Sequence, residues 1–177
     1  ESLTITASAV AISALTSDVD EGTLVLDYGG GAFGVSRISY DLTVRSLDRV
    51  QVSGSGSVSG AGVLGPEGVV EITDSGSLAL TDTHTQDLTV RIDGSGSVTL
   101  DGSSVSLDLT MDGSGDFSGE DLRTQQASAS IAGSGSAWMF VTDTLRASVS
   151  GSGGLTYAGD PVQVAQLHVS ILQGLTH

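Results

Sequence analysis

Residues 87–115 read DLTVRIDGSGSVTLDGSSVSLDLTMDGSG, two copies of a pattern that recurs through most of the chain. In each copy, apolar residues at alternate positions lead into a Gly-Ser-Gly corner, at Asp93–Gly96 and at Asp112–Gly115. Self-similarity at a fixed period of about 20 to 50 residues is typical of solenoids, propellers and arrays. The sequence therefore predicts a stack of repeats.

The repeat keeps its register to both sides of this stretch. An apolar residue precedes each of the six corners. Successive residues of this set are separated by 20, 20, 19, 20 and 18 positions: Val52, Ile72, Ile92, Met111, Ile131 and Val149. The predicted corner glycines are Gly54, Gly56, Gly76, Gly94, Gly96, Gly113, Gly115, Gly133, Gly135, Gly151 and Gly153. A propeller blade needs about forty residues and four antiparallel strands, so this shorter period favours a solenoid.

Alternation with a period of two predicts strands before each corner. Leu88, Val90 and Ile92 point to one side and are predicted to form the core. The same columns are predicted to continue as Leu107, Leu109 and Met111; Ala127, Ala129 and Ile131; Leu145, Ala147 and Val149; and Leu167, Val169 and Ile171. Each column should form a buried ladder along the stack.

A second strand is predicted after each corner, with Val98 and Leu100 inward, and it is matched in other repeats by Leu78, Leu80, Ala137 and Met139. A second corner follows, as at Asp101-Gly102 or Gly119-Glu120, and residues such as Ser103–Ser106 then form a third side. The predicted fold is all-β, a single-stranded parallel β-helix (β-solenoid) with about 20 residues and three short strands per rung.

A repeat that runs through most of the chain predicts one β-solenoid domain over residues 1–177. Residues 46–160 form the regular rungs, and residues 161–177 form an irregular C-terminal rung or cap. Residues 1–45 alternate less regularly and are predicted to form irregular rungs or a cap, with a turn at Asp18–Gly22 and a loop at Tyr28–Gly34. Long amphipathic helices are absent from the pattern.

The corner glycines have a backbone reason, because a sharp turn needs positive φ and a stacked corner leaves no room for side chains. The central serines are predicted to form a hydroxyl ladder: Ser55, Ser75, Ser95, Ser114, Ser134 and Ser152. Asp74 replaces a glycine, which predicts a locally different turn or an aspartate that caps the backbone. The motif matches neither a P-loop nor a calcium-binding repeat.

Composition excludes several functions. A net charge of −15, from 21 acids and six arginines, disfavours binding to nucleic acids or anionic membranes. There is no cysteine for disulfides or thiolate chemistry, and no apolar run approaches the roughly 18 residues of a membrane span. A chain that begins at Glu1 is expected to be a mature product, attached to a membrane only through an anchor outside it.

The chain resembles a known family in LTSDVDEGTLVLD (residues 15–27), ISYDLTVRSLDRVQVSGSGSV (38–58), the DGSG rungs at Asp93 and Asp112, and YAGDP (157–161). These stretches are similar to the GIN domain, the head domain of the auto-transporter adhesin type. The resemblance covers nearly the whole chain. It implies a right-handed parallel β-helix in a secreted or surface-attached protein, and it supplies no catalytic motif.

Candidate chemistry is sparse, and no catalytic, cofactor-binding or metal-ligating residue is predicted. His84, His168 and His177 are far apart in the rung register, which disfavours a shared metal site. Asp93 and Asp112 occupy equivalent positions on successive rungs, roughly 5 Å apart. Stacked carboxylates can bind a divalent cation or share a proton, but a solvated acidic edge is the commoner outcome.

One local anomaly is the sequence Trp138-Met139-Phe140. If Met139 is inward, Trp138 and Phe140 face outward and mark a contact surface, unless an N-terminal segment or the third side covers them. The predicted contact surface comprises Trp138, Phe140, Leu167, Val169, Ile171 and Leu172.

Three function classes follow. The first is a non-catalytic extracellular or cell-surface protein that binds a protein or glycan ligand in adhesion. The second is a structural subunit that self-associates end to end into a filament through its terminal strands, because an open solenoid end exposes unpaired backbone groups. The third is a polysaccharide-degrading enzyme, which scattered arginines support poorly, since a lyase for acidic glycans needs a basic cleft.

Overall fold

The computed structural model describes residues 1–29, 38–166 and 172–175. The chain divides into two compact units, Glu1–Arg45 and Ser46–His177. The predicted loop at Tyr28–Gly34 falls largely outside the described residues. Whether residues 1–177 act as one domain stays a prediction.

The first unit consists of two antiparallel pairs. Its elements are β1 (Ser2–Thr6), α1 (Ala9–Ile12), β2 (Leu15–Asp20), β3 (Thr23–Tyr28) and β4 (Ser39–Thr43). β1 pairs with β4, and β2 forms a hairpin with β3 through Glu21 and Gly22, both at positive φ. The strands predicted here are present, but the predicted turn begins too early, because Asp18 and Asp20 still belong to β2.

Two polar details belong to this unit. The Ser8 side chain caps α1 by accepting a hydrogen bond from the Ala11 amide. Partial burial, and secondarily the carboxylate of Asp27, raise the pKa of Tyr40 above its usual value, because both disfavour the phenolate. The antiparallel pairing distinguishes this unit from the rungs that follow, so a capping role for it stays a prediction.

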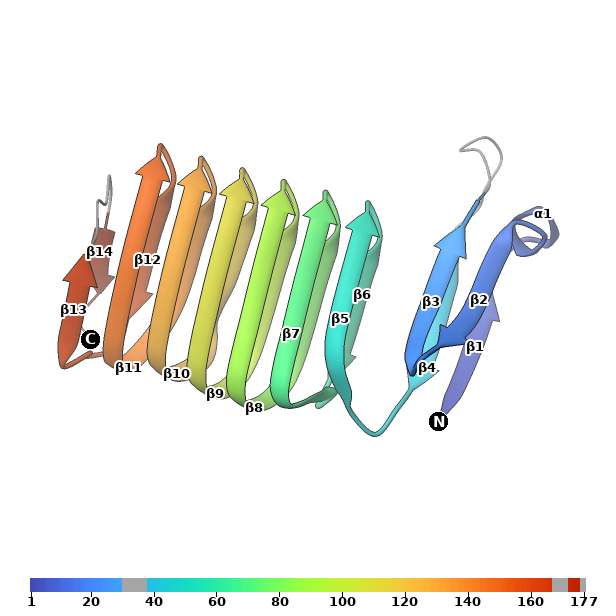
Figure 1. Ribbon diagram of the computed structural model, residues 1–177, viewed down its shortest axis with the longest axis horizontal. Helices are drawn as coiled ribbons and strands as arrows, with labels where there is room; N and C mark the ends of the chain where they lie inside the picture. Colours follow the sequence, from blue (N-terminus) through green and yellow to red (C-terminus); the bar gives the residue numbers. More distant parts are fainter. Residues whose placement is uncertain (30–37, 167–171, 176–177) are drawn as a thin grey trace. The chain divides into compact units, whose positions relative to one another are not determined.

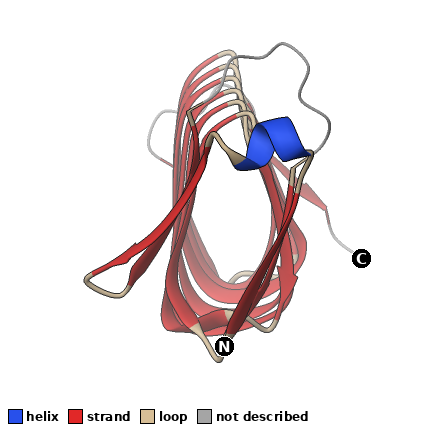
Figure 2. Ribbon diagram, turned by 90° about the vertical axis from the view of Figure 1, so that its right-hand side faces the viewer, coloured by secondary structure: helices blue, strands red, loops and turns tan. Residues whose placement is uncertain are grey.

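The second unit is the predicted parallel β-solenoid, with roughly 20 residues per turn (Figure 1). Its strands are β5 (Leu47–Gly54), β6 (Ser57–Ala61), β7 (Leu64–Asp74), β8 (Ser77–Gly94), β9 (Ser97–Gly113), β10 (Asp116–Gly133), β11 (Ser136–Gly151), β12 (Gly154–Ala158), β13 (Gln163–Gln166) and β14 (Leu172–Leu175). Each strand pairs in parallel with the equivalent strand of the next rung. Seen along the stack, the rungs superimpose as flattened loops (Figure 2).

Within a rung, the strand continues through the second predicted corner, so the three predicted short strands form one long strand. β8 and β10 each run for 18 residues from one Gly-Ser-Gly corner to the next. The second corner lies within these strands as a shift in pairing register, between Leu80 and Thr83 in β8 and between Ser118 and Leu122 in β10. It also contains residues at positive φ, such as Asp82 and Gly102. Backbone pairing therefore continues around this bend, while the Gly-Ser-Gly corner interrupts the strand.

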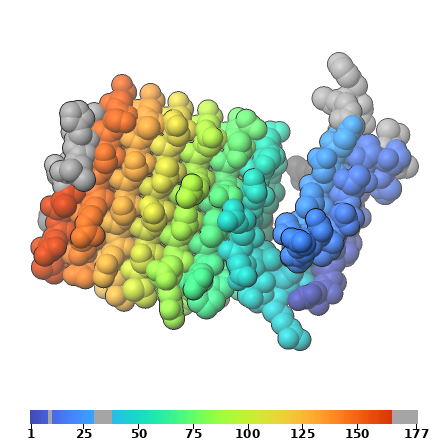
Figure 3. All heavy atoms as spheres, viewed as in Figure 1, coloured from blue at the N-terminus to red at the C-terminus, as the bar shows by residue number. Residues whose placement is uncertain are grey.

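The core consists of the predicted columns. Leu88, Val90 and Ile92 are almost completely buried, and so are their partners on the neighbouring rungs. Val98, Leu100 and Met139 are buried in the second set of columns, as predicted. Strands fill the interior from both sides, and the rungs pack as adjacent bands of atoms (Figure 3).

One buried column is polar, which the sequence pattern did not reveal. Thr85, Ser104 and Thr124 pair on successive rungs and are each less than a tenth exposed. The Thr85 hydroxyl donates to Ser104 Oγ at 3.1 Å, and the Ser104 hydroxyl donates to the Ser106 carbonyl at 2.8 Å. These bonds satisfy groups that would be costly to bury unpaired.

The Gly-Ser-Gly corners stack directly on one another. The Ser114 amide donates to the Gly94 carbonyl at 2.8 Å, and the Ser134 amide donates to the Gly113 carbonyl at 2.8 Å. Gly113 has φ of +120°, and a Cβ there would press on the backbone carbonyl of Gly94. The central serine side chains are exposed, so the serines support the stack through their amides.

Asp74 keeps the pairing of the other corners, but its turn differs locally in φ. Its φ is 78°, close to the 81° of Gly54 and below the 111–120° of the four later corner glycines, while its Cα pairs with those of Gly54 and Gly94. Its carbonyl accepts the Ser95 amide at 2.7 Å, which is the usual bond of the stack. Aspartate is among the few residues that tolerate this left-handed conformation.

The last rung has a different register from the one predicted. Val164, not Leu167, pairs with Leu145 in the parallel ladder of β11 and β13. The reason is rung length, because the chain from Gly154 to Gln163 is as long as the equivalent stretch in the rung of β9. Leu167, Val169 and Ile171 lie outside the described residues.

Gly113→Ala should lower the free energy of unfolding of the solenoid by at least about 3 kcal/mol, because left-handed strain and overlap with the Gly94 carbonyl add. The matched control is Gly54→Ala, which has positive φ but nothing within 4 Å of the new methyl group. It should cost only about 1–2 kcal/mol. Equal losses in denaturant titrations of the two variants would contradict a role for stacking.

Asp74→Gly should stabilise the solenoid by about 0.5–1 kcal/mol, because glycine takes positive φ without strain from a Cβ. Thr73→Gly, one position earlier in β7, should instead destabilise by roughly 1 kcal/mol, since glycine weakens a strand interior. Midpoints of guanidinium unfolding followed by circular dichroism measure both changes. A loss of stability in Asp74→Gly would mean that the carboxylate itself supports the corner.

Candidate functional site

The outer faces of the solenoid carry mostly small hydroxyl side chains. On the face formed after each Gly-Ser-Gly corner, one outward column runs through Ser59, Ala79, Thr99, Ser118, Trp138 and Thr156. From Ser59 to Thr156, Trp138 is thus the one large side chain of this column. It is 40% exposed, while the adjacent Met139 is buried.

Phe140 lies two residues beyond Trp138, on the same outward side of β11. The Arg123 guanidinium, from the rung of β10, lies over the Phe140 ring at 5.3 Å from its centroid. This cation–π contact leaves Phe140 half-buried. We call Trp138, Phe140 and Arg123 the Trp138 patch. Arg123 is the Cα partner of Ser103, so the third side of a rung partly covers Phe140, as one of the two sequence alternatives held, while Trp138 stays exposed.

Polar groups frame the Trp138 patch. Ser118 and Thr156 are the Cα partners of Trp138 on the rungs to either side. The Ser136 hydroxyl, two residues before Trp138, donates to Asp116 Oδ1 at 2.5 Å. An exposed aromatic ring with hydroxyl and carboxylate groups beside it can provide both an apolar contact and directional hydrogen bonds.

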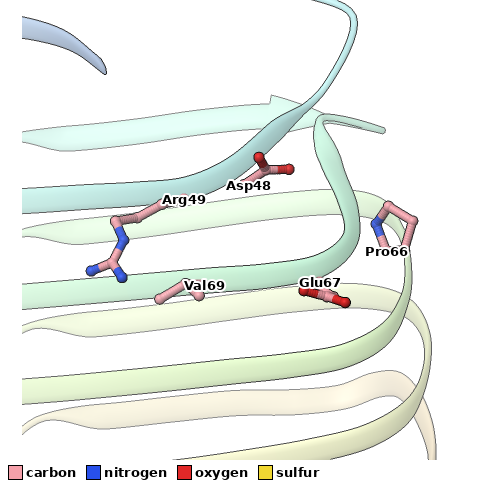
Figure 4. A pocket seen from close by; sticks show the side chains of 5 residues that line it. All are labelled: Asp48, Arg49, Pro66, Glu67 and Val69. Carbon is pink, nitrogen blue, oxygen red and sulfur yellow. The ribbon is translucent and has the colours of Figure 1, made fainter. Parts of the chain in front are cut away.

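A separate depression of about 500 Å³ lies on the surface at the start of the solenoid, lined by Asp48, Arg49, Pro66, Glu67 and Val69 (Figure 4). Arg49 Nη1 forms an ion pair with Glu71 Oε2 at 2.7 Å. The side chains around this hollow are mainly charged and open to solvent. Its arginine is therefore already paired, which leaves little basic character for an anionic ligand.

The other predicted polar groups lie apart from the patch. Asp93 and Asp112 are Cα partners on successive rungs, with Asp74 displaced by one residue, as the sequence predicted, and all three are exposed. His84 Nδ1 lies 3.1 Å from the Asp82 carbonyl. Among residues 1–29, 38–166 and 172–175, no three histidine or acidic side chains are grouped as a metal site requires.

The predicted contact surface falls only partly within the described residues. Leu167, Val169 and Ile171 lie outside the described residues, as do His168 and His177. Leu172 belongs to β14, where its backbone pairs with Leu155. Trp138 and Phe140 are outward, as predicted. Arg123 was missed because its contact joins positions 17 residues apart, which become neighbours only across a rung.

The described part of the chain contains no helix long and apolar enough to cross a membrane.

The comparison with family models shows the family of the chain. Residues 1–161 match the model described as "Putative auto-transporter adhesin, head GIN domain". The chain belongs to this family. The resemblance found in the sequence is thereby confirmed over most of its length, and the GIN domain described here combines an antiparallel unit with a Gly-Ser-Gly solenoid.

Solved structures share the fold of this GIN domain. A putative adhesin from Bacteroides fragilis has a TM-score of 0.86 at 22% identity, with 98% of this chain and 82% of that chain covered. A putative adhesin from Parabacteroides merdae has a TM-score of 0.69 at 19% identity, with 98% and 82% covered. A putative lipid binding protein from Parabacteroides distasonis has a TM-score of 0.68 at 21% identity, with 97% and 83% covered. No curated protein matched the chain.

Proposed function

We propose that this GIN domain is a non-catalytic binding head that acts in adhesion outside the cell or on its surface. It binds its partner through the outer face of the solenoid that carries the Trp138 patch. The observation behind this proposal is the 40% exposure of Trp138 within a column of small side chains. Large exposed aromatic groups on such a surface are typical of contact sites.

The packed interior supports a function on the outside. The inward columns of β7 to β12 form one continuous buried cluster, and the buried hydroxyls have partners. The groups that contact a ligand are therefore the outward-facing side chains. The names of the family and of two structural neighbours, both called adhesins, agree with this role.

The arrangement of charges supports a non-enzymatic role. Arg49 is paired with Glu71, and Arg123 lies over Phe140, so two of the six arginines already have partners. Asp93 and Asp112 lie side by side on an exposed edge instead of facing each other across a groove. Glycoside cleavage requires carboxylates on opposite sides of a bound sugar, and a lyase for acidic glycans requires a basic cleft.

One structural neighbour is named a lipid binding protein. In this chain, the depression is lined by the charged Asp48, Arg49 and Glu67 together with only two apolar residues, Pro66 and Val69, and the solenoid interior is filled. An acyl chain needs an apolar cavity or a broad apolar face. The present geometry therefore favours adhesion over lipid binding.

Adhesion through this face is testable with beads that carry the whole chain, placed on surfaces coated with fixed bacterial cells, mucin or fibronectin. We expect retention under flow on at least one surface, and a drop of at least fivefold for Trp138→Ser, since serine matches the neighbouring small residues. Val105→Ser removes another exposed apolar side chain and should leave retention unchanged. If Trp138→Ser beads were retained as well as Val105→Ser beads, this face would be excluded as the adhesive surface.

A second candidate function is end-to-end assembly. Val58 belongs to an inward column yet is 37% exposed, because it lies in the first rung of the described solenoid. β5 is the last strand of the sheet at that end and β14 is the last at the other. Open strand edges can pair with another chain.

If ends associate, the mass measured by light scattering should rise with protein concentration, and Val58→Lys should abolish the rise by burying a charge at the junction. Trp138→Ser should leave it unchanged. Electron micrographs of the same samples would then show filaments with a repeat near one domain length. A constant monomer mass across concentrations would rule out this second function.

A further inference from the structure

We propose that the Trp138 patch is a platform for a neutral saccharide, with one pyranose ring stacked on the Trp138 indole. This inference names the ligand class of the proposed adhesive face and rests on that function. It is argued from the size of the apolar surface, the polar groups around it and the charge of the chain.

The exposed apolar surface is small. Fully buried tryptophan and phenylalanine side chains contribute about 150–250 Å² each, and here Trp138 is 40% exposed while Phe140 lies partly under Arg123. The patch would supply only a small part of the roughly 1,200–2,000 Å² that a stable protein interface buries in total. Its size matches a ligand of one or two sugar rings.

The polar frame matches the chemistry of a sugar. One face of a pyranose presents C–H groups, which suit the negative face of an aromatic ring, while its edge presents hydroxyl groups. Ser118 and Thr156 flank Trp138 at the rung spacing of about 4.8 Å and can both donate and accept hydrogen bonds. Asp116 can accept bonds from sugar hydroxyls beside its bond with Ser136.

Charge selects a neutral sugar. The chain carries a net charge of −15, and Asp116 is an exposed carboxylate beside the patch. The nearby Arg123 guanidinium already lies over the Phe140 ring. A carboxylated or sulfated glycan would meet repulsion from the excess of carboxylates, which the single guanidinium of Arg123 offsets only in part. Neutral hexoses and N-acetylhexosamines meet no such cost.

The platform is held in place before a ligand arrives. Trp138 lies between Ala137 and Met139, which are both anchored in the core, and its strand is paired on both sides. Phe140 is fixed by Arg123 from the neighbouring rung. A rigid aromatic contact loses little conformational entropy on binding. Repetition of small hydroxyl residues along the column also leaves room for a chain of sugars across several rungs.

Trp138 is the only tryptophan of the chain, so its fluorescence reports directly on the platform. We would titrate the whole chain with cellohexaose, maltohexaose, mannohexaose, galactohexaose and chitohexaose, and with oligogalacturonate as the anionic comparison. We expect a saturable change in emission with at least one neutral hexasaccharide, and binding of oligogalacturonate at least tenfold weaker.

Variants of Trp138 lose the tryptophan signal, so their affinity for the hexasaccharide that binds most tightly is measured by calorimetry. Trp138→Ala should weaken binding at least tenfold, whereas Trp138→Tyr, which keeps an aromatic face, should stay within about threefold of the native chain. Thr156→Val removes a flanking hydroxyl without changing the side-chain shape and should weaken binding about threefold to tenfold. Val105→Ser should bind as the native chain does.

The saccharide proposal and the adhesive function can fail separately. If no neutral hexasaccharide binds while bead retention still depends on Trp138, the saccharide class is wrong and the adhesive face stands. If only phosphatidylcholine vesicles changed the Trp138 emission, the ligand would be a lipid surface. If only a higher protein concentration changed it, the ligand would be a second copy of the chain. Tighter binding of oligogalacturonate than of every neutral sugar would also overturn the proposal.

Discussion

The close stacking of backbone on backbone at the Gly-Ser-Gly corners is the constraint on which the solenoid depends. At each corner an amide of one rung donates to the carbonyl of the rung before it, as Ser114 does to Gly94. A side chain at the first glycine would occupy the space of that carbonyl. Since the strands from β5 to β12 are joined through such corners, this contact sets both the rung spacing and the alignment of these strands.

Alignment by the corners explains the core and the outer faces together. Once the rungs are in register, alternation sends one set of side chains into a continuous apolar interior and the other into straight outward columns. The inward side chains pack against one another, so only the outward columns are available to contact a partner. Trp138 is distinctive because its neighbours in the column from Ser59 to Thr156 are small, so its ring projects from the surface around it.

Much of this arrangement could be predicted from local pattern. The alternation around Ile92 and Met111 identified the core columns, and the outward direction of Trp138 followed from the inward Met139. The prediction failed where the pattern weakens. After Tyr157 there is no Gly-Ser-Gly corner to fix the register, so Leu167 was aligned with Leu145 in place of Val164. The buried Thr85 and Ser104 were missed because a hydroxyl in the core is acceptable only with a partner on the next rung.

The sequence by itself determined the repeat, the solenoid and the inward and outward faces, because a period of about twenty residues and an alternation of two are local properties of the chain. Only the tertiary structure decided which residues meet across rungs. It placed Arg123 over Phe140, brought Ser118 and Thr156 to either side of Trp138, and gave Asp74 the geometry of a glycine. These contacts depend on rung lengths that vary by one or two residues, so small local differences decide which side chains become neighbours.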